Sequence, residues 1–112
     1  MNHRRWEVVF LRADEKDAVG HPAIVLSSDD VMADPKQARF NVVLGTEKQP
    51  AEQARSHHVI LDDADGLEFL TLIDCSLVYV ARKSSVLRKA GVVTMHRRQL
   101  VQRSIRAHLG LG

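Results

Sequence analysis

The sequence has a single cysteine, Cys75, and lacks any long apolar run. One thiol cannot form an internal disulfide, which agrees with a reducing compartment. No apolar run approaches the roughly 20 residues that a membrane-spanning helix needs. The arginines near the start are not followed by an apolar segment and a small-residue cleavage site, so the pattern is not that of a secretory signal. We therefore expect a cytoplasmic protein.

Aromatic residues are scarce, with three Phe, one Trp and one Tyr in 112 residues. Most of them lie in strand-like patterns typical of a core, so we do not expect an aromatic platform that stacks single-stranded bases. The chain also has no internal repeat, no low-complexity tract and no convincing linker. Its length suits one domain with a real core, and residues 1–112 are expected to form that domain.

Patterns that bind metals are missing as well. His57 and His58 are adjacent, and neighbouring residues of a strand face opposite ways. No other Cys or His lies at ligand spacing from them, which argues against zinc. The three aspartates in the range 62–65 lack the spaced ligands and the closing Glu of a calcium loop, so they indicate a turn. We expect neither a metal nor another cofactor.

Acidic residues are absent from the last third of the chain. Residues 1–74 hold eight Lys and Arg with all 14 Asp and Glu, whereas residues 75–112 hold eight Lys and Arg and no acid, so the two parts carry −6 and +8. Such a basic part is a candidate surface for phosphate backbones or for an acidic protein partner. The alternative is that its cations pair with the acidic part of the same domain.

The apolar residues that are present form short strands. Trp6, Val8 and Phe10 alternate with Val9 and Leu11, which predicts a strand with two sets of side chains on opposite faces. A loop with five charges in residues 12–19 follows and is expected to be exposed. It ends at Gly20-His21-Pro22, before a uniformly apolar strand at 22–27 that is expected to cross a core. If the chain has a site, we expect this loop and its Gly-His-Pro end to form part of it.

The later elements are predicted in the same way. Gly45 and Thr46 end a third strand, Thr94 suits the N-cap of a last helix, and Gly110 suits its C-terminal end. The other elements expected are a helical turn around 31–32, strands at 40–44, 57–61, 67–74, 76–81 and 90–94, and a short helix or loop at 83–89. Short strands followed by one helix predict a mainly β (β-rich α+β) fold, a small and strongly bent antiparallel sheet or partly open barrel with a C-terminal α-helix.

Four segments, in this order, cover nearly the whole chain: GHPAIVLSSD, NVVLGT, VILDDADGLEFLTLIDCSLVYV and GVVTMHRRQLVQRSIRAHLGL. Together they resemble the MazF/PemK family of toxin endoribonucleases. That family has a Gly-x-Arg-Pro loop before an apolar strand and Ser, a strand ending in a catalytic Thr or Ser, a Gly-Leu turn between strands, and a capped C-terminal helix. The resemblance implies a compact SH3-like barrel, which the family shares with the CcdB gyrase poisons.

The resemblance also implies a function. Family members are homodimers, cut single-stranded RNA without a metal, and are silenced by a disordered acidic antitoxin. Thr46 matches the catalytic Thr, but His21 occupies the position of the loop Arg, so catalysis of the ordinary family kind is in question. Two other functions stay open. One is a gyrase-poisoning toxin of the CcdB kind, and the other is a catalytically silent relative that binds only nucleic acid or antitoxin.

RNA cleavage by its own 2′-hydroxyl needs a base, an acid and positive charge at the phosphate. Imidazole moves protons near neutral pH, whereas Arg stays charged. We therefore expect His21 to act as general acid or base, Thr46 to donate to the phosphate and Arg12 to supply charge. The alternatives are that His21 is only a loop residue before Pro and that the Thr46 hydroxyl only caps a turn. The contacts expected for RNA or antitoxin are Arg82, Lys83, Arg88 and Lys89.

Overall fold

The computed structural model describes residues 2–111, which contain seven strands, two α-helices and three short 3₁₀ helices. The strands are β1 (Glu7–Leu11), β2 (His21–Val25), β3 (Arg39–Glu47), β4 (His58–Leu61), β5 (Thr71–Asp74), β6 (Tyr79–Arg82) and β7 (Val86–Val92). The helices are α1 (Asp29–Ala33), α2 (Met95–Leu109), η1 (Ala51–Gln53), η2 (Asp63–Asp65) and η3 (Lys83–Ser85). Within this part of the chain, no helix is both long enough and apolar enough to cross a membrane.

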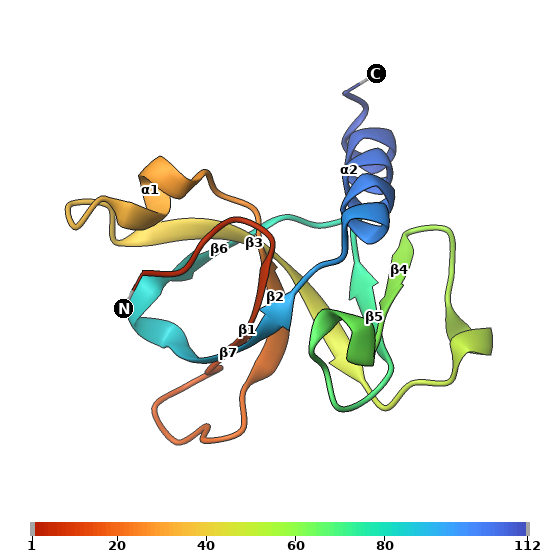
Figure 1. Cartoon of the computed structure of the whole chain (residues 1–112), viewed down its shortest axis with the longest axis horizontal. Coiled ribbons are helices and arrows are strands. Elements are labelled where there is room, and N and C mark those ends of the chain that lie inside the picture. The colour runs from red at the N-terminus through yellow and green to blue at the C-terminus, as the bar shows by residue number, and fades with distance from the viewer. Residues whose placement is uncertain (1, 112) are drawn as a thin grey trace.

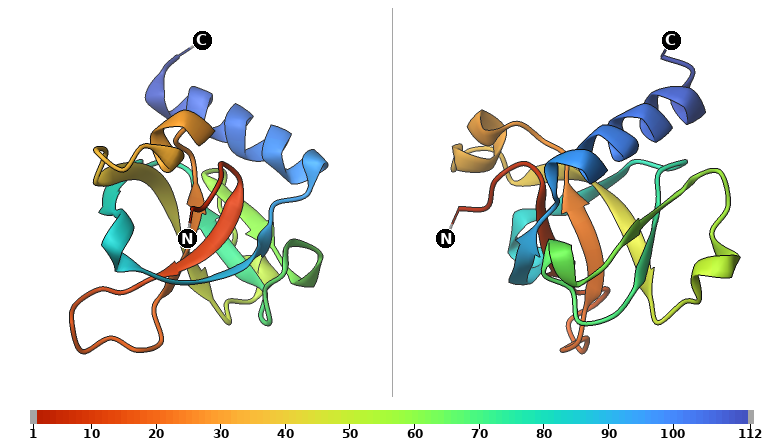
Figure 2. Two further views of the ribbon diagram at one scale, coloured as in Figure 1. Left: turned by 60° about the vertical axis from the view of Figure 1, so that its left-hand side comes forward. Right: turned by 45° about the vertical axis from the view of Figure 1, so that its right-hand side comes forward.

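The strands form one antiparallel sheet whose centre is β3 (Figures 1 and 2). The strand order is β4-β5-β3-β2-β1-β7, and β6 pairs with the first part of β3. β3 pairs with β2 up to Leu44 and with β5 from Gly45 onward, so the sheet bends at this point. A Cβ on Gly45 would lie 2.7 Å from Ile73 Cδ1, so glycine permits the close approach. The expected bent antiparallel sheet with a C-terminal helix is confirmed.

β1 runs between two apolar clusters, and all five of its residues are buried. Val8 and Phe10 belong to the larger cluster, which includes Ile24, Ile73 and Val101 of α2. Val9 and Leu11 belong to the smaller cluster, which lies beneath α1 and is formed with Ala23, Val25, Met32, Phe40 and Val42. The alternation predicted for the first strand is therefore confirmed, and each set of side chains has its own core.

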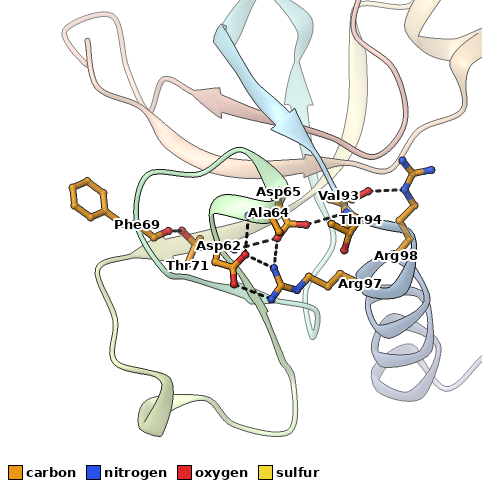
Figure 3. A network of polar contacts seen from close by, with 9 residues as sticks. All are labelled: Asp62, Ala64, Asp65, Phe69, Thr71, Val93, Thr94, Arg97 and Arg98. Carbon is orange, nitrogen blue, oxygen red and sulfur yellow. Dashed lines mark hydrogen bonds and ion pairs between the residues drawn. The ribbon is translucent and has the colours of Figure 1, made fainter.

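The last helix begins and ends where the sequence predicted. Thr94 is its N-cap, and Gly110 is its C-cap in the left-handed conformation (φ 69°). The Thr94 hydroxyl makes no capping hydrogen bond, but its N–H donates to Asp65 Oδ1 at 2.9 Å. Arg97 donates to Asp62 and Asp65 and thereby joins α2 to the turn formed by residues 62–66 (Figure 3). The aspartates predicted to form a turn therefore also anchor the helix.

Two predicted strands and one segment predicted as helix or loop differ from the structure. The segment 67–70 is a loop, because the Leu67 N–H bonds to the Asp62 carbonyl and β5 starts only at Thr71. The third strand does not end at Gly45-Thr46, because β5 provides a new partner there. Most of 83–89 is strand rather than helix or loop, since β7 begins at Val86. β7 is a basic strand at the edge of the sheet. Two register shifts allow it to pair with β1 although its apolar residues do not alternate.

Candidate functional site

The loop between β1 and β2 is exposed, as predicted, and projects from the end of the molecule opposite α2 (Figures 1 and 2). Asp17 holds it together. Its carboxylate accepts the N–H groups of Ala13 (2.8 Å), Val19 (3.1 Å) and Gly20 (2.9 Å). These backbone donors, first those of Gly20 and Ala13, lower the pKa of Asp17. The carboxylate therefore stays ionised while it ties both ends of the loop to one point.

The turn that follows places His21 at the surface. Gly20 has φ +81°, and a Cβ there would lie 2.9 Å from Leu87 Cδ1, so the position requires glycine. His21 is the first residue of β2 and pairs with Leu11. Its side chain is 64% exposed, whereas Pro22 is buried. The imidazole is exposed at the first position of β2, whereas Ala23 and Val25, which share its face of the strand, are fully buried.

Arg88 fastens the same loop from β7. Its guanidinium lies 4.1 Å from the centroid of the Phe10 ring and donates to the Val19 carbonyl at 3.0 Å. Both contacts engage the cation within the chain. Arg88 was predicted to contact RNA or antitoxin, and in the structure it also supports the loop that carries His21.

A pocket of about 370 Å³ lies beside this loop. Arg12 and His21 line it from the two ends of the loop, Leu44 lines it from β3, and Tyr79 and Arg82 line it from β6. Of the three residues predicted to be catalytic, the structure brings two, Arg12 and His21, into one pocket. The arrangement combines an exposed imidazole with two guanidinium side chains and an aromatic ring.

Tyr79 was missed because the strand pattern around it is typical of a core. It is 41% exposed in the structure, and Phe69 is 37% exposed with Lys48 Nζ 4.5 Å from its ring centroid. The expectation that most aromatic rings are buried is wrong for these two. β6 borders solvent in the structure, and Arg82 at its end is exposed as well.

Thr46 lies outside the residues that line the pocket. It is exposed within β3 and pairs with Leu72, so it does not follow the strand as predicted. The register that sets Ala23 opposite Leu44 would set His21 opposite Thr46 if the ladder continued, but β3 leaves β2 after Leu44. Thr46 therefore lies at the same end of the sheet as His21, beyond the bend.

The four predicted binding residues differ in availability. Arg82 is exposed and lines the pocket. Lys83 Nζ donates to the carbonyls of Val31 (2.6 Å) and Asp34 (2.9 Å) and so caps the end of α1. Lys89 Nζ lies 3.6 Å from Glu7 Oε2. Lys83 and Lys89, like Arg88, thus have partners within the chain.

Cys75 is fully buried in the larger apolar cluster, and burial raises the pKa of its thiol to about 11. Asp74 accepts the N–H (2.8 Å) and hydroxyl (2.5 Å) of Ser76, a structural role. No group of three or more His, Cys, Asp or Glu within residues 2–111 is arranged to hold a metal.

His57 and His58 do not point apart as expected. His57 precedes β4, and the two ring centroids are 4.1 Å apart. His58 lines a second pocket, of about 550 Å³, between β4 and α2, together with His96 and His108. Burial, and then the neighbouring charge of His57, lower the pKa of His58. Its Nδ1 accepts the Arg55 N–H at 2.9 Å, which also favours the neutral ring.

The fold is that of the MazF toxins. An endoribonuclease solved with its cognate antitoxin, from Mycobacterial species, superposes with a TM-score of 0.76 and 15% identity over 99% of this chain and 96% of its own. The toxin MazF-mt6 of Mycobacterium tuberculosis gives 0.76 and 15% over 95% and 98%. A MazE–MazF structure from Deinococcus radiodurans gives 0.76 and 13% over 100% of both chains. The sequence matches no protein-family model and no curated protein.

Proposed function

We propose that this chain is the toxin of a toxin–antitoxin pair, a metal-independent and sequence-specific endoribonuclease of the MazF/PemK kind that cleaves single-stranded RNA. The observation that carries the proposal is the pocket beside the β1–β2 loop, which combines His21 with Arg12 and Arg82 on a fold shared with endoribonucleases.

The pocket offers groups for one of the two proton transfers of the cleavage and for the charge at the phosphate. The 2′-oxygen of a ribose bonds to the neighbouring phosphorus and loses its proton to a base, while the bond from phosphorus to the 5′-oxygen breaks and an acid protonates the leaving oxygen. His21 can fill either proton-transfer role near neutral pH. Arg12 and Arg82 would hold the phosphate oxygens and stabilise the charge that develops on them. The exposed ring of Tyr79 would stack on a base.

Thr46 would donate its hydroxyl to a phosphate at the other side of the β3 bend. A strand of RNA that spans the pocket and this bend would contact both His21 and Thr46. Such an arrangement fits a groove that recognises the phosphate backbone of the RNA. Binding of that kind weakens as salt rises, because counterions compete for the phosphates.

We also infer a cytoplasmic homodimer whose partner is an acidic antitoxin peptide. The acid-free part of the chain, residues 75–112, complements an acidic tail in charge. Two of the structural neighbours are described with an antitoxin or with MazE. For the homodimer, large apolar side chains are exposed at Leu77, Val80 and Met95.

The test is incubation of the purified protein with a long end-labelled RNA in EDTA, beside His21→Ala, Arg12→Ala and Thr46→Ala. His96→Ala is the matched control, because it removes an exposed imidazole outside this pocket. Discrete cleavage that persists in the control and is lost in His21→Ala would support the proposal. Cleavage that survives His21→Ala would remove this histidine from the mechanism. No cleavage of several RNAs by the wild type would move the function to gyrase or to binding alone.

A further inference from the structure

The carboxylate of Asp17 lies within ion-pair reach of the imidazole of His21, with Oδ2 4.0 Å from Nε2. We propose that Asp17 is a positioning residue for His21, which fixes the turn before the imidazole and holds a negative charge beside the ring. The inference deepens the proposed function and rests on it for its catalytic meaning. Its physical part, the pairing of the two side chains, is independent of RNA.

The geometry makes this pairing part of the turn. Gly20, which directly precedes His21, is one of the three residues whose N–H groups bind Asp17, and Ala13 at the other end of the loop is another. The side chain of Asp17 is only 18% exposed although the loop around it is solvated. The carboxylate cannot move away from His21 without releasing these backbone donors, so its charge has a fixed place beside the ring.

The surrounding charges explain why a carboxylate is needed there. Arg12 and Arg82 line the same pocket as His21, and Tyr79 is the other titratable group that faces it. Two guanidinium groups disfavour a third positive charge nearby. A general acid must carry a proton before it can give one to the leaving 5′-oxygen. Asp17 places a negative charge beside the imidazole in a pocket that also contains two guanidinium groups and has to attract phosphate.

Asp17→Asn is the informative variant, because the amide keeps the size of the side chain and one of its two acceptor oxygens but removes the charge. Asp14→Asn is the matched control in the same loop, since Asp14 accepts the Lys16 N–H at 2.8 Å and is exposed. NMR would follow the titration of the His21 ring in the protein without RNA. The rate of RNA cleavage would then be measured across pH, with kcat and KM determined separately.

We expect the midpoint of the His21 ring titration to move to lower pH in Asp17→Asn and to stay unchanged in Asp14→Asn. The kcat of Asp17→Asn should fall by about tenfold or more at neutral pH, with KM within about twofold, and should recover in part as the pH is lowered. A purely structural role would not produce recovery at acid pH.

The contrary outcomes are separate for the two claims. An unchanged His21 ring titration in Asp17→Asn would overturn the pairing. If such a variant also lost activity and showed widespread changes of the loop amide signals, the role of Asp17 would be structural only. If the His21 titration shifts as expected in Asp17→Asn but the wild-type protein cuts no RNA, the pairing is supported and the proposed function is overturned.

Discussion

Replacing Arg97 by Met tests whether the network in Figure 3 fixes α2 on the sheet. Arg97 donates to both oxygens of Asp62 (2.6 and 2.9 Å) and to Asp65 Oδ2 (2.6 Å). Asp65 is fully buried, and it also accepts the N–H groups of Asp62 (3.1 Å) and Thr94 (2.9 Å). Without the guanidinium, a buried carboxylate keeps two backbone donors and loses its opposite charge.

The expected cost follows from burial. Removing one partner of a buried ion pair destabilises a protein by about 3–5 kcal/mol. Asp62 is 37% exposed, so its ion pair with Arg97 adds little to the stability, as is usual for surface pairs. Asp65 keeps its two backbone donors in the variant. We therefore expect the lower end, about 3 kcal/mol. With about 2.1 cal/mol/K of unfolding entropy per residue, a chain of this length loses about 13 °C in its unfolding midpoint.

Thermal and urea unfolding followed by circular dichroism would measure this loss. Arg103→Met is the matched control, because Arg103 is exposed on the same helix and makes no ion pair within residues 2–111. The control should change stability by no more than about 0.5 kcal/mol. In an Asp65→Asn background, the cost of Arg97→Met should shrink by at least about 1 kcal/mol. Equal costs in both backgrounds, or a loss no larger than that of the control, would refute the reasoning.

Three further predictions concern other parts of the structure. The Arg97 hydrogen bond lowers the pKa of Asp62 from 3.8 to about 2. The stability that this pair contributes is therefore present above pH 3.8 and is lost as the pH falls towards 2. Urea unfolding across this range should show that the free energy of unfolding declines less steeply in Arg97→Met than in wild type. Gly91→Ala should destabilise by about 2 kcal/mol or more in the same assay, because its Cβ would overlap the backbone of the 62–66 turn, whereas Gly110→Ala, with open space around it, should cost about 1 kcal/mol. Lys83→Met should speed amide hydrogen exchange in α1, whose carbonyls it caps, and leave the salt dependence of RNA binding unchanged; a slope reduced by about one would show a phosphate contact instead.

The parts of the fold that follow from local patterns could be predicted. The two faces of the first strand were predicted from the apolar residues in both alternating sets of Trp6–Leu11, whereas the separate cluster that each set joins was seen only in the structure. The last helix was predictable from its helical spacing and from Gly110. Only the end of β7 was predicted, as part of a strand at 90–94, because Arg88 and Lys89 interrupt the apolar pattern before it and two register shifts absorb the irregularity. Such shifts depend on the partner strand and leave no local pattern.

The candidate site was predicted only in part for a related reason. The exposed loop and the position of His21 follow from composition and from Gly20-His21-Pro22. The sequence does not show which cationic side chains remain free to bind a partner, because the acceptors of Lys83 are backbone carbonyls about 50 residues away in the chain. Tyr79 was assigned to the core by strand pattern alone, whereas its place at the pocket depends on how β6 pairs with β3.

The proposed mechanism accounts for a histidine at position 21, where the MazF/PemK family, which the sequence resembles, has a loop arginine. On the proposed mechanism, positive charge at the phosphate and proton transfer are separate tasks. Arg12 and Arg82 line the pocket and can supply the charge without an arginine at position 21. On this mechanism His21 is then free to move protons in a pocket that it shares with two guanidinium groups. Asp17, held by three backbone N–H groups of the same loop, places a fixed negative charge 4.0 Å from its imidazole.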